Sequence, residues 1–147
     1  MTTRRAVRAD LDTMVAMGRE FLATVYPQRL ADNPDALRAL GEQLLARPDS
    51  VLFVAEVPHA GVVGMIGMMV YPHPMSGERV ASELFWWMDP AHRGAGGVWL
   101  LRQAEAWAQV QGAELLQMIA PNRDVAAFYE RIGFTAIETT YLRRLDA

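Results

Sequence analysis

A strand that passes through a glycine-rich turn directly into a helix is the feature that most limits the possible folds. Residues Arg79 to Met88 carry apolar side chains on both alternating faces, which is typical of a strand covered on two sides. A turn at 89–92 follows, and then the segment Arg93-Gly94-Ala95-Gly96-Gly97. The residues after this segment have apolar side chains at helical spacing, which predicts a helix that ends at Gly112. Glycines let successive backbone N–H groups point at one ligand, and the positive end of the helix dipole favours an anion. The segment therefore predicts a phosphate or diphosphate site, with a plain glycine-rich connection as the alternative.

Two common phosphate-binding motifs do not fit this turn. The dinucleotide motif G-x-G-x-x-G needs glycine or alanine where Trp99 stands, and its strands are joined by parallel crossovers. Here the apolar runs 51–57 and 62–71 flank a short turn, which predicts an antiparallel hairpin whose second, wholly apolar run is central. The Walker A loop needs a lysine, and the chain has none. The turn is therefore expected within a mixed, largely antiparallel sheet.

Composition narrows the class of protein further. The 147 residues, 52% of them hydrophobic, suit one domain that spans residues 1–147. The absence of cysteine excludes disulfides, thiolate metal sites and an acyl-cysteine intermediate. The formal charge of −3 gives no basic field for nucleic acid, and no apolar run approaches the roughly 20 residues that cross a bilayer. We therefore expect a cytoplasmic protein with neither a nucleic-acid nor a membrane partner.

The remaining segments alternate between strand and helix patterns. Helical spacing predicts helices over 10–26, 33–47 and 122–132, the last of them capped by Asn122. Strands are predicted over 3–9 and 114–119, and residues 134–145 are predicted to form one or two short strands. The pattern as a whole predicts an α/β domain.

These segments together resemble the GCN5-related N-acetyltransferase (GNAT) family. The turn matches the family motif [QR]-x-x-G-x-[GA] at Arg93 and Gly96, whereas Val98 stands where the family has glycine or alanine. Phe128 to Phe134 is similar to the family segment F-Y-x-x-x-G-F, and Asn122 precedes it. The resemblance covers residues 51–134 well. It implies an α/β fold with a mixed, mostly antiparallel sheet of six or seven strands and about four flanking helices.

The resemblance also implies a co-substrate and the residues that bind it. Acetyl-CoA would lie in a cleft where the strand ending at Met88 and the strand ending at Ile119 diverge. The Met88 backbone would hold the pantetheine arm and the thioester carbonyl, and Asn122 would reach the pantetheine. The diphosphate would bind the turn formed by Arg93, Gly94, Ala95, Gly96, Gly97 and Val98. No metal is expected, since the three histidines match no HExxH zinc site.

Two side chains are candidates for the chemistry of such a transfer. In the family, the tyrosine at the position of Tyr129 protonates the departing thiolate, and the alternative is a tyrosine that only packs. Glu83 is the candidate base, because an amine with a pKa of about 10.4 must lose a proton before it attacks. Strict alternation would put Glu83 on one strand face with Ala81, Phe85 and Trp87, where burial would raise its pKa. The alternative for Glu83 is an arginine partner or a place at the solvent-exposed edge of the cleft.

The resemblance implies that the first two helices shape the site for the acetyl acceptor. Phe21, Tyr26 and Tyr71 are the candidates for lining it. The acceptor would be an amine of a small molecule or a peptide, and a direct transfer suits a chain without cysteine. Only 14 residues follow Gly133, which leaves a sheet edge in need of cover and suggests a homodimer. The alternative is a catalytically weak acyl-CoA-binding or protein-interaction module that keeps the fold. Val98 and the short C-terminus favour this alternative.

Overall fold

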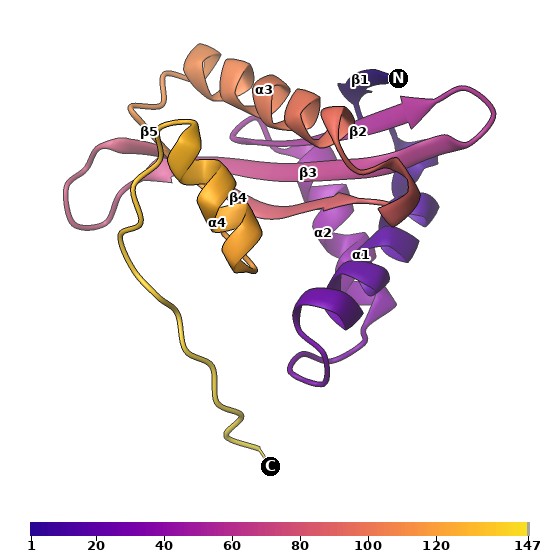
Figure 1. Cartoon of the computed structure of the whole chain (residues 1–147), viewed down its shortest axis with the longest axis horizontal. Helices are drawn as coiled ribbons and strands as arrows, with labels where there is room; N and C mark the ends of the chain where they lie inside the picture. The colour runs from indigo at the N-terminus through magenta and orange to yellow at the C-terminus, as the bar shows by residue number, and fades with distance from the viewer. Residues whose placement is uncertain (147) are drawn as a thin grey trace.

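One mixed sheet organises the structure, a computed structural model that describes residues 1–146 (Figure 1). Its strands are β1 (Thr2–Arg5), β2 (Ser50–Val57), β3 (Gly61–Pro72), β4 (Arg79–Met88) and β5 (Leu115–Gln117). The α-helices in the described part are α1 (Leu11–Val25), α2 (Pro34–Ala46), α3 (Ala95–Val110) and α4 (Arg123–Arg131). Two short 3-10 turns, Arg8–Asp10 and Pro90–His92, precede α1 and α3.

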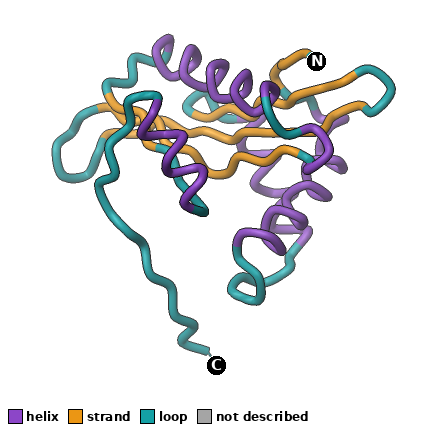
Figure 2. Tube along the Cα trace, in the orientation of Figure 1, coloured by secondary structure: helices purple, strands orange, loops and turns teal. Residues whose placement is uncertain are grey.

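The strand order follows the chain, β1-β2-β3-β4-β5. The first four strands pair antiparallel, and β5 pairs parallel with β4. The predicted hairpin, the central place of its second strand and the mixed, mostly antiparallel sheet are therefore confirmed. The sheet has five strands rather than six or seven, because residues 134–146 form no strand and run away from the sheet as an extended segment (Figure 2).

Helices α1 and α2 cover one face of the sheet, and α3 covers the other. α1 buries residues at helical spacing, and together with α2 it packs over one apolar cluster that includes Leu52, Phe85 and Trp87. Gly18 of α1 leaves room for the Leu37 side chain of α2. A Cβ added at Gly18 would lie 3.0 Å from Leu37 Cδ2. α3 covers the opposite face, where its Leu100, Ala104 and Trp107 join the cluster of Ile66 and Met68. The sheet is thus buried on both faces, as its apolar strands predict.

A β-bulge in β4 changes which side chains share a face. Gly67 of β3 pairs with Phe85 and Met68 pairs with Glu83, so Leu84 has no partner and the alternation shifts by one residue. Phe85 and Trp87 therefore pack on the α1–α2 face, whereas Ala81 and Met88 belong to the α3 face. The expectation that Glu83 shares a face with Phe85 and Trp87 was wrong, because strict alternation holds only as far as the bulge.

Within residues 1–146, no helix combines the length and the apolar character that crossing a membrane requires. The longest helix, α3, has 16 residues and turns charged and polar side chains outward, among them Arg102, Gln103 and Glu105. Its buried residues instead lie on the side that packs on the sheet. The helix is therefore a covering layer of the sheet.

Candidate active site

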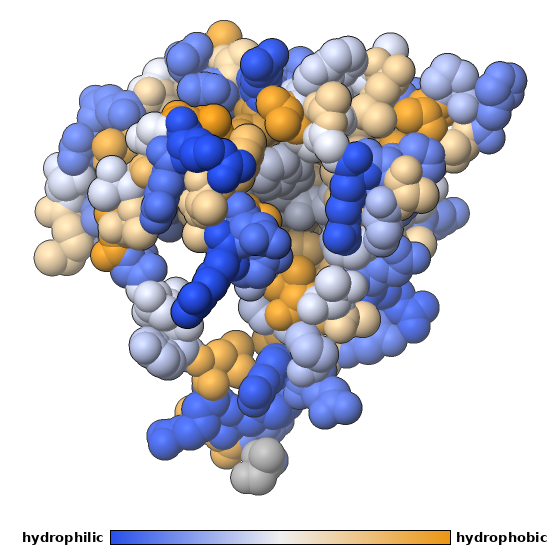
Figure 3. Space-filling view, viewed as in Figure 1, coloured by the Kyte–Doolittle hydropathy of each residue, from blue (hydrophilic) through white to orange (hydrophobic). Residues whose placement is uncertain are grey.

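The two parallel strands of the sheet diverge where the site lies. β4 and β5 pair over three residues each, ending at Ser82 and Gln117, but β4 continues to Met88 without a neighbour on that side. An opening of this kind exposes backbone groups along β4 that have no ladder partner. Figure 3 shows a hollow on this face of the molecule. On one side of the hollow lie α4 and the C-terminal segment, and on the other side lies α1. The divergence predicted between these strands is present.

Glu83 lies at the first step of this divergence. Its Oε1 accepts hydrogen bonds from the Ile119 N–H (3.1 Å) and from the Tyr129 hydroxyl (3.3 Å). The Tyr129 hydroxyl also lies 3.1 Å from the Ile119 carbonyl oxygen, to which it can donate. Glu83 is thus neither paired with an arginine nor exposed at the cleft edge, since only 7% of it is accessible. The two candidate catalytic side chains are direct hydrogen-bond partners.

Burial sets the acid strength of both groups. Loss of solvent raises the pKa of Glu83 from 4.5 to about 7, against the opposing effect of the two hydrogen bonds it accepts. Burial also raises the pKa of Tyr129 above its ordinary value, and the neighbouring Glu83 carboxylate adds to this effect. The ring of Tyr129 stacks on Trp86, with centroids 6.2 Å apart, and packs against Phe134. The arrangement holds a neutral phenol beside a carboxyl group that changes charge near neutral pH.

The glycine-rich turn presents unpaired backbone donors. Gly94 has a φ of +124°, a conformation open to glycine and strained for other residues, and it caps the start of α3. The Gly97 N–H bonds to the Gly94 carbonyl, whereas the N–H groups of Gly94, Ala95 and Gly96 find no acceptor among residues 1–146. Val98 is half-buried within the first turn of α3 and does not interrupt these donors. The turn has the form of an anion site at a helix N-terminus.

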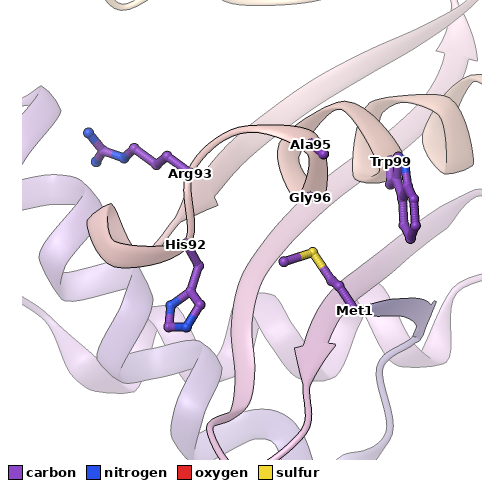
Figure 4. A pocket seen from close by; sticks show the side chains of 6 residues that line it. All are labelled: Met1, His92, Arg93, Ala95, Gly96 and Trp99. Carbon is purple, nitrogen blue, oxygen red and sulfur yellow. The ribbon is translucent and has the colours of Figure 1, made fainter.

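A hollow of about 200 Å³ adjoins this turn (Figure 4). Its lining residues come from the chain terminus, the turn and α3, and are Met1, His92, Arg93, Ala95, Gly96 and Trp99. The Met1 side chain points toward Gly96, and a Cβ at Gly96 would collide with the Met1 sulfur atom. Glycine at position 96 thus leaves room for the Met1 side chain, whose flexible end would have to move if a Cβ were added there.

The end of β4 faces the open side of the sheet. The Asp89 N–H donates to Val63 of β3, so the backbone groups of Met88 point away from β3. The Met88 carbonyl accepts a hydrogen bond from Arg93 Nε (3.3 Å), and the Arg93 guanidinium lies 5.1 Å from the ring centroid of Trp87. Sequence reasoning missed this contact of Arg93, because it depends on how the turn folds back over the strand.

Asn122 and the acceptor candidates occupy different places. Asn122 caps α4 through a hydrogen bond from the Val125 N–H to its side-chain oxygen, as predicted. Phe21 lies edge-on to both Tyr26 and Trp87, at 5.9 and 6.4 Å between centroids. The structure thus brings two of the three acceptor candidates together with Trp87, whose buried Nε1 has no hydrogen-bond partner among the described residues.

Tyr71 does not join this group. It pairs with Val80 in the ladder, six positions along β3 from Met65, which pairs with Trp87. Six residues of strand span roughly 20 Å. The Tyr71 hydroxyl instead bonds to Ser82 Oγ at 2.9 Å.

Ile119 is the second residue of the candidate site that the sequence did not indicate. Its backbone N–H and carbonyl contact Glu83 and Tyr129, and a backbone group carries no residue-type signal. The end of the strand predicted over 114–119 was the available hint. No group of three or more metal-ligating side chains gathers anywhere in residues 1–146.

Comparisons with known proteins agree with this fold. Residues 16–134 match the sequence model of the Acetyltransferase (GNAT) family. A transcriptional regulator from Bacillus halodurans C-125 has 25% identity and a TM-score of 0.79, with 98% of this chain and 99% of that chain covered. No curated protein sequence matches the chain.

Two further solved structures share the fold at lower identity. The aminoglycoside antibiotic 6'-N-acetyltransferase AAC(6')-IG from Acinetobacter haemolyticus is 21% identical, with a TM-score of 0.76 and coverage of 98% and 97%. A predicted acetyltransferase with acetyl-CoA from Clostridium acetobutylicum is 17% identical, with a TM-score of 0.81 and coverage of 98% and 96%.

Proposed function

The chain belongs to the GNAT acetyltransferase family, and we propose that it transfers an acetyl group from acetyl-CoA directly to a primary amine of a small molecule or a peptide. The family uses acetyl-CoA as co-substrate and an amine as acceptor. One observation of this chain carries the proposal: a buried carboxyl and a buried phenol share a hydrogen bond where β4 and β5 diverge. We propose that residues 1–147 carry this activity as one domain.

The glycine-rich turn supports the binding of the co-substrate. The free N–H groups of Gly94, Ala95 and Gly96 at the positive end of α3 suit the diphosphate. We assign the rest of this subsite to Arg93, Gly97 and Val98 of the same turn. Arg93 supplies a charge that can leave the Met88 carbonyl for a phosphate, because its single bond there is long and its side chain is exposed.

The backbone at the end of β4 and the start of α4 would hold the rest of the co-substrate. The Met88 N–H faces the open side of β4, where it would donate to the thioester carbonyl and stabilise the negative charge that develops on its oxygen. The Asn122 side-chain amide would donate to the pantetheine arm, because its oxygen is already occupied by the Val125 N–H.

The Glu83–Tyr129 pair balances the protons of the reaction. The amine attacks in its neutral form, and Glu83 accepts the proton that the nitrogen loses as the C–N bond forms, a role that suits a carboxyl group with a pKa of about 7. As the new C–N bond forms and the C–S bond breaks, Tyr129 gives its hydroxyl proton to the departing sulfur. Glu83 then returns the proton to the phenolate across the 3.3 Å hydrogen bond. The amine proton thus reaches the thiol, and both residues return to their starting state.

The aromatic group of Phe21, Tyr26 and Trp87 supports an acceptor site on the α1 side of β4. Tyr71, distant along the sheet, is assigned no contact with the same acceptor atoms. The net charge of −3 favours a cationic acceptor.

Thiol release from acetyl-CoA in the presence of a panel of amines tests the proposal. We expect amine-dependent release, with kcat rising through pH 7 as Glu83 ionises and falling by about 10²-fold or more in Tyr129→Phe. Tyr141→Phe is the matched control, because Tyr141 is 90% exposed and far along the C-terminal segment. Undiminished thiol release by Tyr129→Phe would show that Tyr129 is not the general acid, while the assignment of the protein as an acetyltransferase would stand.

The alternative is a module that binds acyl-CoA or a protein and transfers nothing. Saturating acetyl-CoA at a hundred times its Kd stabilises a binding protein by about 2.7 kcal/mol. Stabilisation without release for any amine would favour the acyl-CoA-binding module, and neither stabilisation nor release would favour the protein-interaction module.

A further inference from the structure

Trp86 lies on the face of β4 that carries α3 and α4. Its neighbours along the strand, Phe85 and Trp87, pack on the α1–α2 face instead. Trp86 packs against the cluster under α3, and its Cζ2 would lie 3.4 Å from a Cβ added at Gly97, in the first turn of that helix. The same ring stacks on Tyr129 of α4, with centroids 6.2 Å apart and an angle of 24° between the planes. The indole of Trp86 therefore contacts both the start of α3 and the candidate general acid.

Tyr129 is the point at which α4 is fixed to the sheet. Figure 1 shows α4 over the part of the sheet where β4 and β5 diverge. Of the nine residues of this helix, Tyr129 is the one that is buried. Phe128 and Phe134 also contact its ring, but they belong to α4 and to its end, so they move together with Tyr129. Trp86 is the ring that ties Tyr129 to a strand.

Hydrogen bonds alone define the direction of the phenol weakly. The Tyr129 hydroxyl lies 3.3 Å from Glu83 Oε1 and 3.1 Å from the Ile119 carbonyl oxygen. Both distances exceed the roughly 2.7–2.8 Å that hydroxyl donors usually reach, and the two acceptors compete for one proton. Offset-stacked rings add a preferred geometry to the contact area that they bury. The stack on Trp86 therefore does most to orient the phenol.

The indole of Trp86 occupies this place at a cost. Its Nε1 is buried and has no hydrogen-bond partner among residues 1–146. A buried donor without an acceptor destabilises the folded state, and leucine or phenylalanine at this position would avoid that loss. Residues that break a rule of packing in this way gather at functional sites.

We propose that Trp86 is a positioning residue of the acetyl transfer, whose ring holds the Tyr129 hydroxyl where it can donate to the departing sulfur. The inference rests on the proposed function, because it takes Tyr129 as the general acid. Trp86 itself neither gives nor takes a proton, so its effect on the rate passes through the place of the phenol. A misplacement of about 1 Å in a reacting group can cost about 10²-fold in rate.

Thiol release by variants of Trp86, alone and combined with Tyr129→Phe, tests this role. Trp86→Leu should lower kcat about 10-fold and leave the KM for acetyl-CoA within about twofold, because the turn binds through its own backbone. Trp86→Phe keeps a ring against Tyr129 and should hold kcat within about threefold. In the Tyr129→Phe background Trp86→Leu should have no further effect on kcat, since no hydroxyl is left to position. A further loss of kcat in the double variant would overturn the inference and leave the transferase standing.

Trp107→Leu is the matched control. It makes the same change at a tryptophan of the α3 cluster that is 5% exposed and is not among the ring neighbours of Tyr129. We expect a lower midpoint of urea unfolding and an unchanged kcat. A fall in kcat equal to that of Trp86→Leu would assign the effect to loosening of the cluster and contradict the inference. Trp86→Met, which fills more of the space with a flexible chain, is the second variant without a ring.

Urea unfolding of the same proteins gives a readout that needs no turnover. Tyr129→Phe removes the hydroxyl alone, so it should lower the midpoint in the unmodified chain through loss of its hydrogen bond. In the Trp86→Leu or Trp86→Met background the shift should fall to less than about half, because the hydroxyl is no longer held at Glu83. An equal shift in both backgrounds would overturn the positioning role. If the unmodified protein releases no thiol with any amine, the proposed transfer fails, and this comparison alone decides whether Trp86 positions the phenol.

Discussion

Replacement of Glu83 by glutamine tests the cost of the buried carboxyl group. Glutamine keeps an oxygen that can accept from the Ile119 N–H and the Tyr129 hydroxyl, but it cannot ionise. Between pH 4.5 and about 7 an unfolded chain ionises this carboxyl group while the folded chain keeps it protonated. The native state therefore loses stability as pH rises through this window, and the loss is complete above it.

The expected size follows from the two pKa values. At about 1.4 kcal/mol for each pKa unit, 4.5 against about 7 corresponds to about 3 kcal/mol. The free energy of unfolding of Glu83→Gln minus that of the unmodified protein should rise by this amount from pH 4.5 to pH 8. Other titrating groups are common to both proteins and cancel in the difference.

Urea unfolding followed by tryptophan fluorescence at pH 4.5, 6, 7 and 8 measures this difference. Glu105→Gln makes the same chemical change at an exposed site on α3 and separates the effect of burial from that of the substitution. A difference for Glu83→Gln that stays constant across this range to within about 0.5 kcal/mol, the usual scatter of surface substitutions, would refute the reasoning.

Three further perturbations test other parts of the structure. Gly94→Ala should lower the free energy of unfolding by about 1–3 kcal/mol and raise the KM for acetyl-CoA, because alanine strains the +124° φ; an unchanged KM would separate the turn from co-substrate binding. Asn122→Ala should cost about 1 kcal/mol in urea unfolding through loss of the bond from the Val125 N–H, and Asn122→Asp should restore it. Arg4→Ala should destabilise more at pH 7 than at pH 3, because Arg4 lowers the pKa of Asp10 and the stability this confers is lost as pH falls below about 4. Equal destabilisation at both pH values, measured by chemical unfolding, would assign the effect to packing.

Local patterns in the sequence predicted most of the elements. Proline at the start of α2 with Asn33 before it, the hairpin and the glycines before α3 are short-range signals, and each element forms where expected. The prediction of one or two strands over 134–145 was wrong. Residues with strand propensity form a strand only when they lie beside the edge of a sheet, and this segment does not.

In the candidate site, too, short-range patterns in the sequence indicated some residues, whereas the contacts between residues could not be predicted. Glycines before a helix indicated an anion-binding turn, and F-Y-x-x-x-G-F singled out Tyr129 through its resemblance. The partners of these residues were not predictable, since Ile119 acts through its backbone and Arg93 reaches Met88 only after the turn folds back. Tyr71 and Phe21 are equally suitable by residue type, and only the ladder separates them.

The order of residues alone determined the α/β class, the antiparallel hairpin and the start of α3, because each depends on the backbone preferences of a few neighbouring residues. The tertiary structure decided the environment of Glu83. The unpaired Leu84 shifts the alternation of β4, so Phe85 and Trp87 face α1 while Glu83 meets Tyr129. A bulge depends on the fit of one strand to its neighbour, and that fit exists only when the sheet has formed.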